Sequence, residues 1–457
     1  MKKIIVVILA VAVCLSLMFA IYNINSFESL MRPPKLSGEN RLLQHAFEQS
    51  VINSDGIVMK NPLSGFYTSS YLFFDMNNDG QEEALVFYSD LSEDNLACVS
   101  IFKKVGKEWN FVSKIKGQTE DFYEVNFADI NGDNISEILL SWKTNENIES
   151  VRATDFGVLG NRVLSVYSFD GISTTLLKTE SYSNIHVSDF NKDGSDDFLF
   201  VNLSFSGQEK KTTGRILSFN KDYSVARELS VSLTGLLEVY NIATDSVIEN
   251  QNEFTRIFID GAISERGVIT EVIKVSHNDF ELSLPLYEMN QSQNPVTLRD
   301  TRLFSMDFDG DNIIEIPTLE LFPGAVRIEK GTSERSSLNL TVWNELNNSE
   351  ISVDKKCVVN TSYEYMLIID DSWINMISAI YDYNNSTLTF YYLKDDGEFD
   401  EEIFSLRAFS NPEWQSDDAG YYKLVENSAY VYGYKFNNAD LKSDFEDYLK
   451  ENFRVYS

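Results

Sequence analysis

Four stretches of the chain place oxygen-bearing side chains at one repeated spacing within nine residues. Acidic or amide side chains stand at positions one, three and five, a carboxylate at position nine, and Gly or Asn at position six. Hard cations bound by oxygen atoms, above all Ca²⁺, need this set of ligands. The sequence therefore predicts up to four structural Ca²⁺ sites, with the metal ligands Asp75, Asn77, Asp79, Glu83, Asp129, Asn131, Asp133, Glu137, Asp189, Asn191, Asp193, Asp197, Asp307, Asp309, Asp311 and Glu315.

Position six of these loops is occupied by Gly80, Asn134, Gly194 and Asn312. A chain that wraps around a cation must turn sharply, and Gly and Asn enter the left-handed backbone region at the lowest cost. An Asx-rich turn without metal is the alternative for any single loop. Four loops with matched positions favour metal sites over four unrelated turns.

The residues on either side of the loops are typical of β-strands. An EF-hand would need Glu at position twelve and a helix on each side, but position twelve is Val86, Leu140, Phe200 and Thr318. Short aromatic and β-branched runs such as 71–74 and 84–88 flank the loops instead. Each loop is therefore expected to join two strands.

These loops and strands resemble the FG-GAP/VCBS repeats, best known from the β-propeller of integrin α-subunits. The resemblance extends over roughly residues 64 to 360. It implies propeller blades with Ca²⁺ held in the turn between the first two strands of a blade. Clear Phe-Gly and Gly-Ala-Pro signatures are missing, so ligand recognition of the integrin type is not implied. With the N-terminal segment described below, the chain looks like a surface-anchored member of bacterial type.

The spacing of the loops predicts the number of blades. Asp75 and Asp129 are 54 residues apart, Asp129 and Asp189 are 60 apart, and Asp189 and Asp307 are 118 apart, about twice the other intervals. One repeat is therefore hidden near residue 248, where strand-like sequence persists but the ligand spacing does not. The fold predicted is mainly β, a propeller of about five blades of which one lacks a metal loop.

The N-terminus predicts export. Lys2 and Lys3 precede a nearly all-apolar run from Ile4 to Tyr22, which is long enough to span a bilayer. We expect residues 1–22 to be an uncleaved anchor. A cleaved signal peptide and a lipoprotein signal with Cys14 as the lipid-bearing residue are the alternatives. The chain would thus lie at the cell membrane with its bulk outside the cytoplasm, where millimolar Ca²⁺ fills modest sites.

The rest of the chain supplies two flanking parts. Residues 23–63 are expected to form a proline-containing stalk and a helix that begins after the N-cap Ser37 and packs on the first blade. Residues 64–360 are expected to form the propeller. Residues 361–457 are expected to form a separate, small α+β domain that ends in a helix from about Ala439 to Phe453, with Leu441 and Phe445 on its apolar face.

Composition limits the partners and the chemistry. A formal net charge of −32 argues against nucleic acid, since a phosphate-binding surface must be basic. Cys98 and Cys357 lie in apolar surroundings and are expected to be small buried residues, with a disulfide between them as the alternative.

The chain shows no signature of catalysis. None of its three histidines, His45, His186 and His277, lies in an HExxH motif, and the chain has no Walker loop, GxSxG or CxxC. We therefore expect a non-catalytic Ca²⁺-binding propeller, tethered to the membrane by its N-terminal segment, that binds an unknown protein or polysaccharide. The alternative is a propeller enzyme, a glycoside hydrolase or polysaccharide lyase, with paired carboxylates in an axial pocket.

Overall fold

Strands predominate in the computed structural model, which describes residues 38–50, 56–143, 162–206, 209–264, 267–291, 295–416 and 420–456. The prediction of a mainly β protein is confirmed. Within these residues, no helix has both the length and the apolar character needed to span a membrane. The predicted anchor (residues 1–22), the prolines of the stalk and Ser37 lie outside the described residues. The described part divides into two compact units, which are taken in turn.

The first unit contains, among the described residues, 38–50, 56–128, 134–143 and 162–180, and it carries two antiparallel sheets. In the first sheet, β3 pairs with β1, β2 and β4, and β5 follows β4. The second sheet has the order β6-β7-β8-β9. The strands are β1 (Ile57–Met59), β2 (Tyr71–Phe74), β3 (Glu83–Asp90), β4 (Leu96–Val105), β5 (Glu108–Lys116), β6 (Asp121–Ala128), β7 (Glu137–Lys143), β8 (Arg162–Phe169) and β9 (Thr174–Tyr182), with a 3-10 turn, Leu91–Glu93, between β3 and β4.

Helix α2 (Glu39–Ser50) lies against the first sheet. Its buried residues Leu43 and Phe47 stand four positions apart and so share one helix face. The Phe47 ring meets the Tyr88 ring edge-on at 4.9 Å. The predicted packing of this helix on the first sheet is therefore confirmed.

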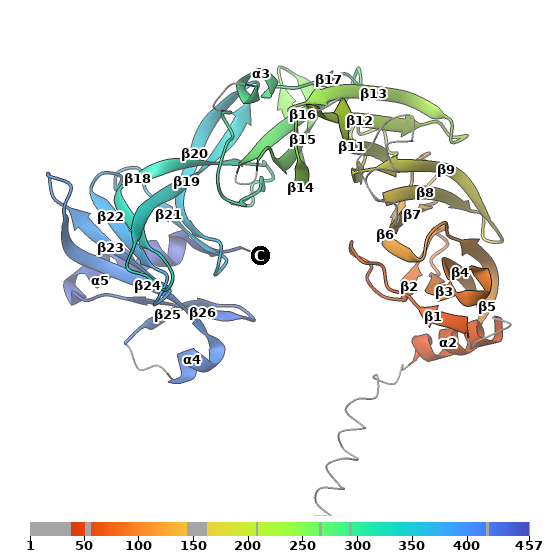
Figure 1. Cartoon of the computed structure of the whole chain (residues 1–457), viewed down its shortest axis with the longest axis horizontal. Coiled ribbons are helices and arrows are strands. Elements are labelled where there is room, and N and C mark those ends of the chain that lie inside the picture. Colours follow the sequence, from red (N-terminus) through yellow and green to blue (C-terminus); the bar gives the residue numbers. More distant parts are fainter. Residues whose placement is uncertain are drawn as a thin grey trace, which may run out of the picture. The chain divides into compact units, whose positions relative to one another are not determined.

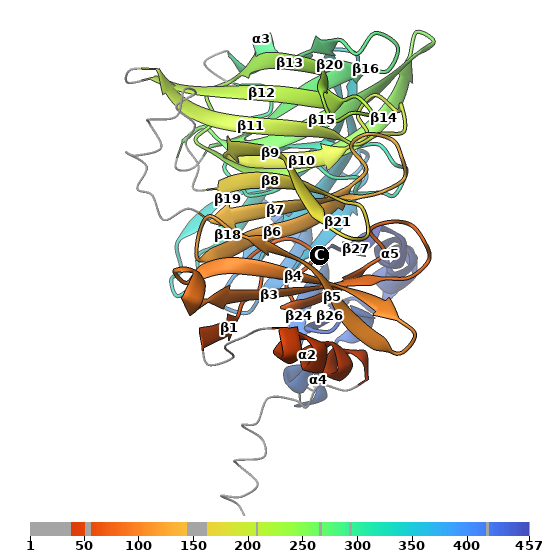
Figure 2. The ribbon, with the colours of Figure 1, turned by 90° about the vertical axis from the view of Figure 1, so that its right-hand side faces the viewer.

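The second unit begins with two further antiparallel meanders, which Figure 2 shows strand beside strand in chain order for β11, β12 and β13. The third sheet has the order β10-β11-β12-β13, and the fourth has β14-β15-β16-β17. The short helix α3 follows the fourth sheet. The elements are β10 (Asn184–Ser188), β11 (Asp197–Ser206), β12 (Glu209–Phe219), β13 (Val225–Leu233), β14 (Glu238–Glu249), β15 (Asn252–Ala262), β16 (Val268–Ser276), β17 (Leu282–Ser283) and α3 (Tyr287–Asn290).

The rest of the second unit is built on one ten-stranded sheet, whose strands run from cyan to blue in Figure 1. Its order is β25-β26-β24-β23-β22-β18-β19-β20-β21-β27, antiparallel except for the parallel pair β18 and β22. The strands and helices are β18 (Ile316–Ile328), β19 (Arg335–Asn347), β20 (Glu350–Asn360), β21 (Tyr365–Ile369), β22 (Ile377–Asp382), β23 (Thr387–Leu393), β24 (Phe399–Ser410), α4 (Asn411–Ser416), β25 (Tyr422–Glu426), β26 (Tyr430–Lys435), α5 (Ala439–Asn452) and β27 (Phe453–Val455).

Two expectations concern this last region. The predicted C-terminal helix is present as α5, and its residues Phe445 and Leu449 lie in the core cluster of the ten-stranded sheet. The predicted boundary at residue 361 falls between β20 and β21, which pair with each other, so strands on both sides of it share one sheet. The division of the chain into domains stays a prediction.

Candidate metal sites

All four acidic loops join two paired segments, as the strand-like flanks predict. The first, second and third loops (75–83, 129–137 and 189–197) lead from β2 to β3, from β6 to β7 and from β10 to β11. The fourth loop (307–315) lies between the bridged residues Met306 and Glu315 and leads into β18. The first three loops therefore join two paired strands, and the fourth joins two bridged residues at the start of β18.

The carboxylate at position one organises the loop in every copy. It accepts a hydrogen bond from the backbone N–H of position five at 3.1 Å in each of the four loops. Its second oxygen accepts the N–H of position six in the first, third and fourth loops, at 2.8, 3.0 and 2.9 Å. One Asp thus curls the chain around its own side chain in an Asx-type turn, the local geometry named above as the alternative to a metal site.

Two positions of each loop adopt the left-handed conformation. At position six, φ is 82° for Gly80, 64° for Asn134, 93° for Gly194 and 70° for Asn312, which confirms the prediction for these residues. Position four is also left-handed, and there Lys192 has φ 58°. Sequence reasoning missed position four, although Asn78, Gly132 and Gly310 at this position were a readable signal.

The carboxylate at position nine lies under the loop, away from solvent. Glu83, Glu137 and Asp197 are fully buried, and Glu315 is 1% exposed. In three loops this carboxylate accepts the backbone N–H of position two, at 3.0 to 3.1 Å. A buried carboxylate is costly unless it is paired, so its second oxygen needs a partner.

In the third loop that second oxygen has no partner. Asp197 accepts the Phe190 N–H through Oδ2, while Oδ1 is buried without a hydrogen bond. Burial, together with the nearby carboxylates of Asp193 and Asp189, raises the pKa of Asp197 to about 8. The charges of Asp189 and Asp193 thus disfavour ionisation of a buried carboxyl whose second oxygen is unpaired.

The fourth loop brings its carboxylates closest together. Oxygen atoms of Asp307, Asp309 and Asp311 lie within 4.8 Å of one another. Burial raises the pKa of Glu315 to about 8, and the three loop carboxylates add to this effect. Burial, followed by the charge of Asp311, also raises the pKa of Asp309. The loop thus brings three carboxylates together and places the buried Glu315 within reach of their charges, which is oxygen chemistry that suits a Ca²⁺ site.

The first loop contains a cation of its own. Lys103, from β4, places its Nζ 3.1 Å from Asp79 and 3.8 Å from the buried Glu83. The hydrogen bond from Lys103 holds the pKa of Asp79 below its usual value. Sequence reasoning missed this lysine because it follows the loop by twenty residues and reaches it only through strand pairing.

Residues 129–133 of the second loop contact the third loop. The N–H of Asp196 donates to the Asp129 carbonyl at 2.8 Å, and the N–H of Asp129 donates to the Asp196 carboxylate at 3.2 Å. Asn131 donates to Asp133 at 3.0 Å, and the same contact between positions three and five recurs in the third loop at 2.8 Å.

The fourth sheet replaces a metal loop with a plain hairpin. The predicted hidden repeat near residue 248 lies in β14, and a two-residue turn, Asn250 and Gln251 with φ 50° and 68°, joins it to β15. Beside this hairpin the buried Asp245 receives the Arg256 guanidinium and the Ile314 N–H. In the fourth sheet, where the predicted ligand spacing is lost, the positive charge beside the buried carboxylate therefore comes from Arg256.

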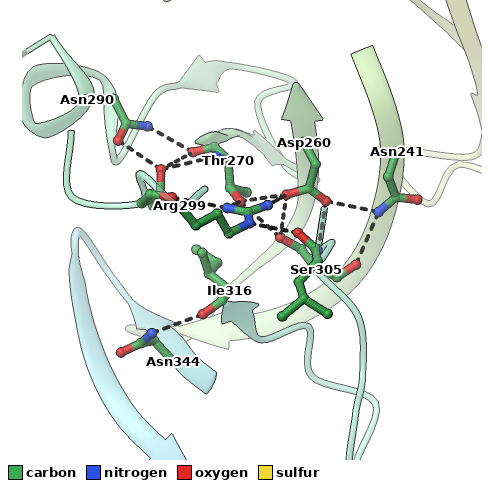
Figure 3. A network of polar contacts seen from close by, with 10 residues as sticks. Asn241, Asp260, Thr270, Asn290, Arg299, Ser305, Ile316 and Asn344 are labelled. Carbon is green, nitrogen blue, oxygen red and sulfur yellow. Dashed lines mark hydrogen bonds and ion pairs between the residues drawn. The ribbon is translucent and has the colours of Figure 1, made fainter. Parts of the chain in front are cut away.

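A second buried ion pair fixes the segment after this sheet (Figure 3). Arg299 donates to Asp260 at 2.7 Å and to Thr270 at 3.0 Å, and the Ser305 N–H donates to Asp260 at 2.7 Å. Asn290 donates to the carbonyl of Thr270 at 2.8 Å. These polar groups all pair with other groups of the protein, so we infer that the network stabilises the fold.

The histidines take part in ordinary packing and hydrogen bonding. His186, in β10, stacks on the Phe190 ring, and burial lowers its pKa. His277 shares a hydrogen bond with the Thr255 hydroxyl, and His45 lies near Gln49 on α2. Cys98 and Cys357 are buried and free, as expected for small core residues.

The comparisons with known proteins give no family. No family model and no curated protein matches the chain. Among solved structures, a functionally unknown protein from Desulfotomaculum acetoxidans is 13% identical (67% of this chain and 76% of that chain, TM-score 0.23). A hypothetical protein from Leishmania major is 11% identical (68% and 93%, TM-score 0.23). A levansucrase mutant from B. megaterium is also 11% identical (67% and 89%, TM-score 0.26). Likenesses of this size assign neither a family nor an activity.

Proposed function

We propose that the four acidic loops bind Ca²⁺ and that the metal stabilises the strand pairs which they close. The observation that carries this proposal is the buried Oδ1 of Asp197, which has no hydrogen-bond partner beside the carboxylates of Asp189 and Asp193. A divalent cation would supply the missing partner. When bound, it neutralises the loop carboxylates, which otherwise repel one another.

The donor chemistry favours Ca²⁺ over other metals. The loops offer carboxylate and amide oxygens and contain neither His nor Cys, which zinc and other transition metals prefer. Ca²⁺ accepts six to eight oxygen ligands in flexible geometry, whereas Mg²⁺ demands a near-ideal octahedron and retains water. Loops of nine residues with ligands at positions one, three, five and nine suit the more tolerant ion.

The arrangement of the sheets supports a propeller. Four successive meanders, each with a loop or hairpin between its first two strands, agree with blades that repeat at the interval of the loops. In the next repeat the loop leads into β18, and β18, β19 and β20 pair in chain order as β11, β12 and β13 do. We infer about five blades, four of them with a Ca²⁺ loop, as the resemblance to FG-GAP/VCBS repeats implies.

We further propose that the protein is a non-catalytic binding module, held at the cell membrane by residues 1–22 with its bulk outside the cytoplasm. The four loops contain 15 of the 70 Asp and Glu residues of the chain, and metal binding would account for these. Each of two pockets in the described residues includes one carboxylate, Asp300 in one and Glu288 in the other. A glycosidase would need a pair of them.

Thermal melts of the full chain in millimolar Ca²⁺ and in EGTA test the metal proposal. We expect a higher melting temperature in Ca²⁺, because a ligand that binds only the folded state stabilises it. Mg²⁺ at the same concentration should give a smaller shift. Equal melting temperatures in Ca²⁺ and EGTA would reject the proposal.

A further inference from the structure

One cavity in the second unit has the chemistry of a ligand pocket. It measures about 110 Å³ and lies beside the irregular part of β18, where the register with β19 shifts between Leu321 and Val326. Leu319, before the shift, and Arg327, after it, both line the cavity. The irregularity thus opens space beside an otherwise continuous sheet.

The walls combine hydroxyl, amide and aromatic groups. Tyr365 and Tyr381 are buried, and the ring of Tyr383 meets that of Tyr381 edge-on at 4.5 Å. Asn360 is buried, whereas Asn339 and Asp300 are exposed at the rim. A small polar molecule with its own hydroxyls would find both donors and acceptors here.

Two hydroxyl groups of the lining residues have no hydrogen-bond partner. The Oη of Tyr381, a residue that is 5% exposed, and the Oγ1 of Thr301 are both buried and unpaired. The amide of Asn360, which also lies near the Tyr381 hydroxyl, donates to the Tyr365 hydroxyl at 3.3 Å. An unpaired buried hydroxyl costs about 1–3 kcal/mol, so a bound molecule that pairs with either group would recover free energy.

The charges of the pocket favour a neutral ligand. Arg327 already donates from Nε to the Ser336 hydroxyl at 2.7 Å and lies 3.3 Å from Glu329. Its positive charge is therefore balanced within the chain. Asp300 at the rim is an acceptor for ligand hydroxyls rather than a partner for an anion.

We propose that this cavity binds a neutral sugar ring, presented as the terminal residue of a glycan. A cavity of about 150 Å³ takes up benzene, so a ring with hydroxyls would enter in part and project past Asn339 and Asp300. This inference rests on the proposed role as a binding module, and it specifies a glycan as the class of partner. Tyr381 and Thr301 supply hydroxyls, and the tyrosine rings supply an apolar wall.

Saturation-transfer NMR on the full chain with Ca²⁺, in the non-glycosidic detergent lauryldimethylamine oxide, tests this. The probes are methyl α-glucoside, methyl β-galactoside, methyl α-mannoside and N-acetylglucosamine. We expect at least one to bind in the millimolar range. Tyr381→Phe should weaken it about three- to tenfold, the scale of one lost hydrogen bond, without lowering the melting temperature, since the deleted hydroxyl has no partner in the protein.

Tyr434→Phe is the matched control, because that hydroxyl donates to Glu446 outside the cavity. It should leave sugar binding unchanged. The proposal is overturned if none of the four sugars binds, or if Tyr381→Phe binds as tightly as the unaltered chain, or if Tyr434→Phe weakens binding equally. A Ca²⁺-dependent melting shift in the same samples separates failure of the pocket from failure of the metal sites.

Discussion

Replacing Asp197 with Asn should stabilise the metal-free protein and should give a smaller gain in Ca²⁺. In the metal-free protein the Asp197 carboxyl ionises near pH 8, against 3.8 for an ordinary Asp. At pH 7 the carboxyl is therefore ionised in the unfolded chain and protonated in the folded one. This difference destabilises the folded state by about 4 kcal/mol, since each pH unit between 3.8 and 7 contributes about 1.36 kcal/mol. The neutral amide of the variant would not carry this cost.

The variant has a cost of its own. The amide oxygen still accepts the Phe190 N–H, but the NH₂ group takes the place of the unpaired Oδ1, at about 1–3 kcal/mol. We expect Asp197→Asn to be about 1–3 kcal/mol more stable than the unaltered chain in EGTA at pH 7. In about 2 mM Ca²⁺ the unaltered chain regains about 0.7–1.8 kcal/mol at this site, for a dissociation constant of about 10⁻⁴ to 10⁻³ M.

Urea denaturation of the full chain at several pH values, in Ca²⁺ and in EGTA, measures both effects. Because the folded pKa is raised, the metal-free protein loses stability as pH rises from about 4 to about 8. Near pH 4 this ionisation cost disappears and only the cost of the unpaired NH₂ group remains, so the variant should there be about 1–3 kcal/mol less stable than the unaltered chain. Asp222→Asn, an equal charge change in an exposed turn, should respond alike in Ca²⁺ and EGTA. A variant that is less stable in EGTA at pH 7, or that gains as much from Ca²⁺ as the unaltered chain, refutes the reasoning.

Three further changes test other parts of the structure. Lys103→Met removes the cation that lies on the first loop, so calorimetric titration should show about two- to fivefold tighter Ca²⁺ binding there; weaker binding would contradict this role. Asp260→Ala leaves Arg299 buried and unpaired and should cost about 3–5 kcal/mol in urea denaturation, whereas a loss below about 1 kcal/mol would show that the ion pair is dispensable. Glu271→Gln replaces a carboxyl whose pKa burial raises, so the stability of the variant relative to the unaltered chain should increase as pH rises from about 4 to about 7; a difference that does not change between these pH values would argue against the raised pKa.

The acidic loops could be predicted because their determinants are local. Oxygen donors at fixed positions and Gly or Asn at position six act within nine residues, and the turn forms around the carboxylate at position one. The missing loop in the fourth sheet could be predicted for the same reason, since the interval between loops showed where a repeat had to lie.

The contacts that complete these sites depend on strand pairing, which the sequence does not display. Lys103 reaches the first loop only because β4 pairs with β3, and Asp196 meets Asp129 across 67 residues. The ten-stranded sheet is a similar case. β22 joins β18 in a parallel pair across more than fifty residues, and no local pattern marks either strand for that partner. The cavity beside β18 is lined by residues of both strands, so it could not be predicted from the sequence either.

Counting bound Ca²⁺ tests the central claim most directly. Equilibrium dialysis of the full chain against millimolar Ca²⁺, followed by elemental analysis, should give about four ions per chain, and Asp197→Asn should bind one fewer. The prediction rests on four loops that share one geometry at positions one and five. A chain that retains no Ca²⁺ above the dialysis buffer, or a variant that retains the same number, would contradict the account.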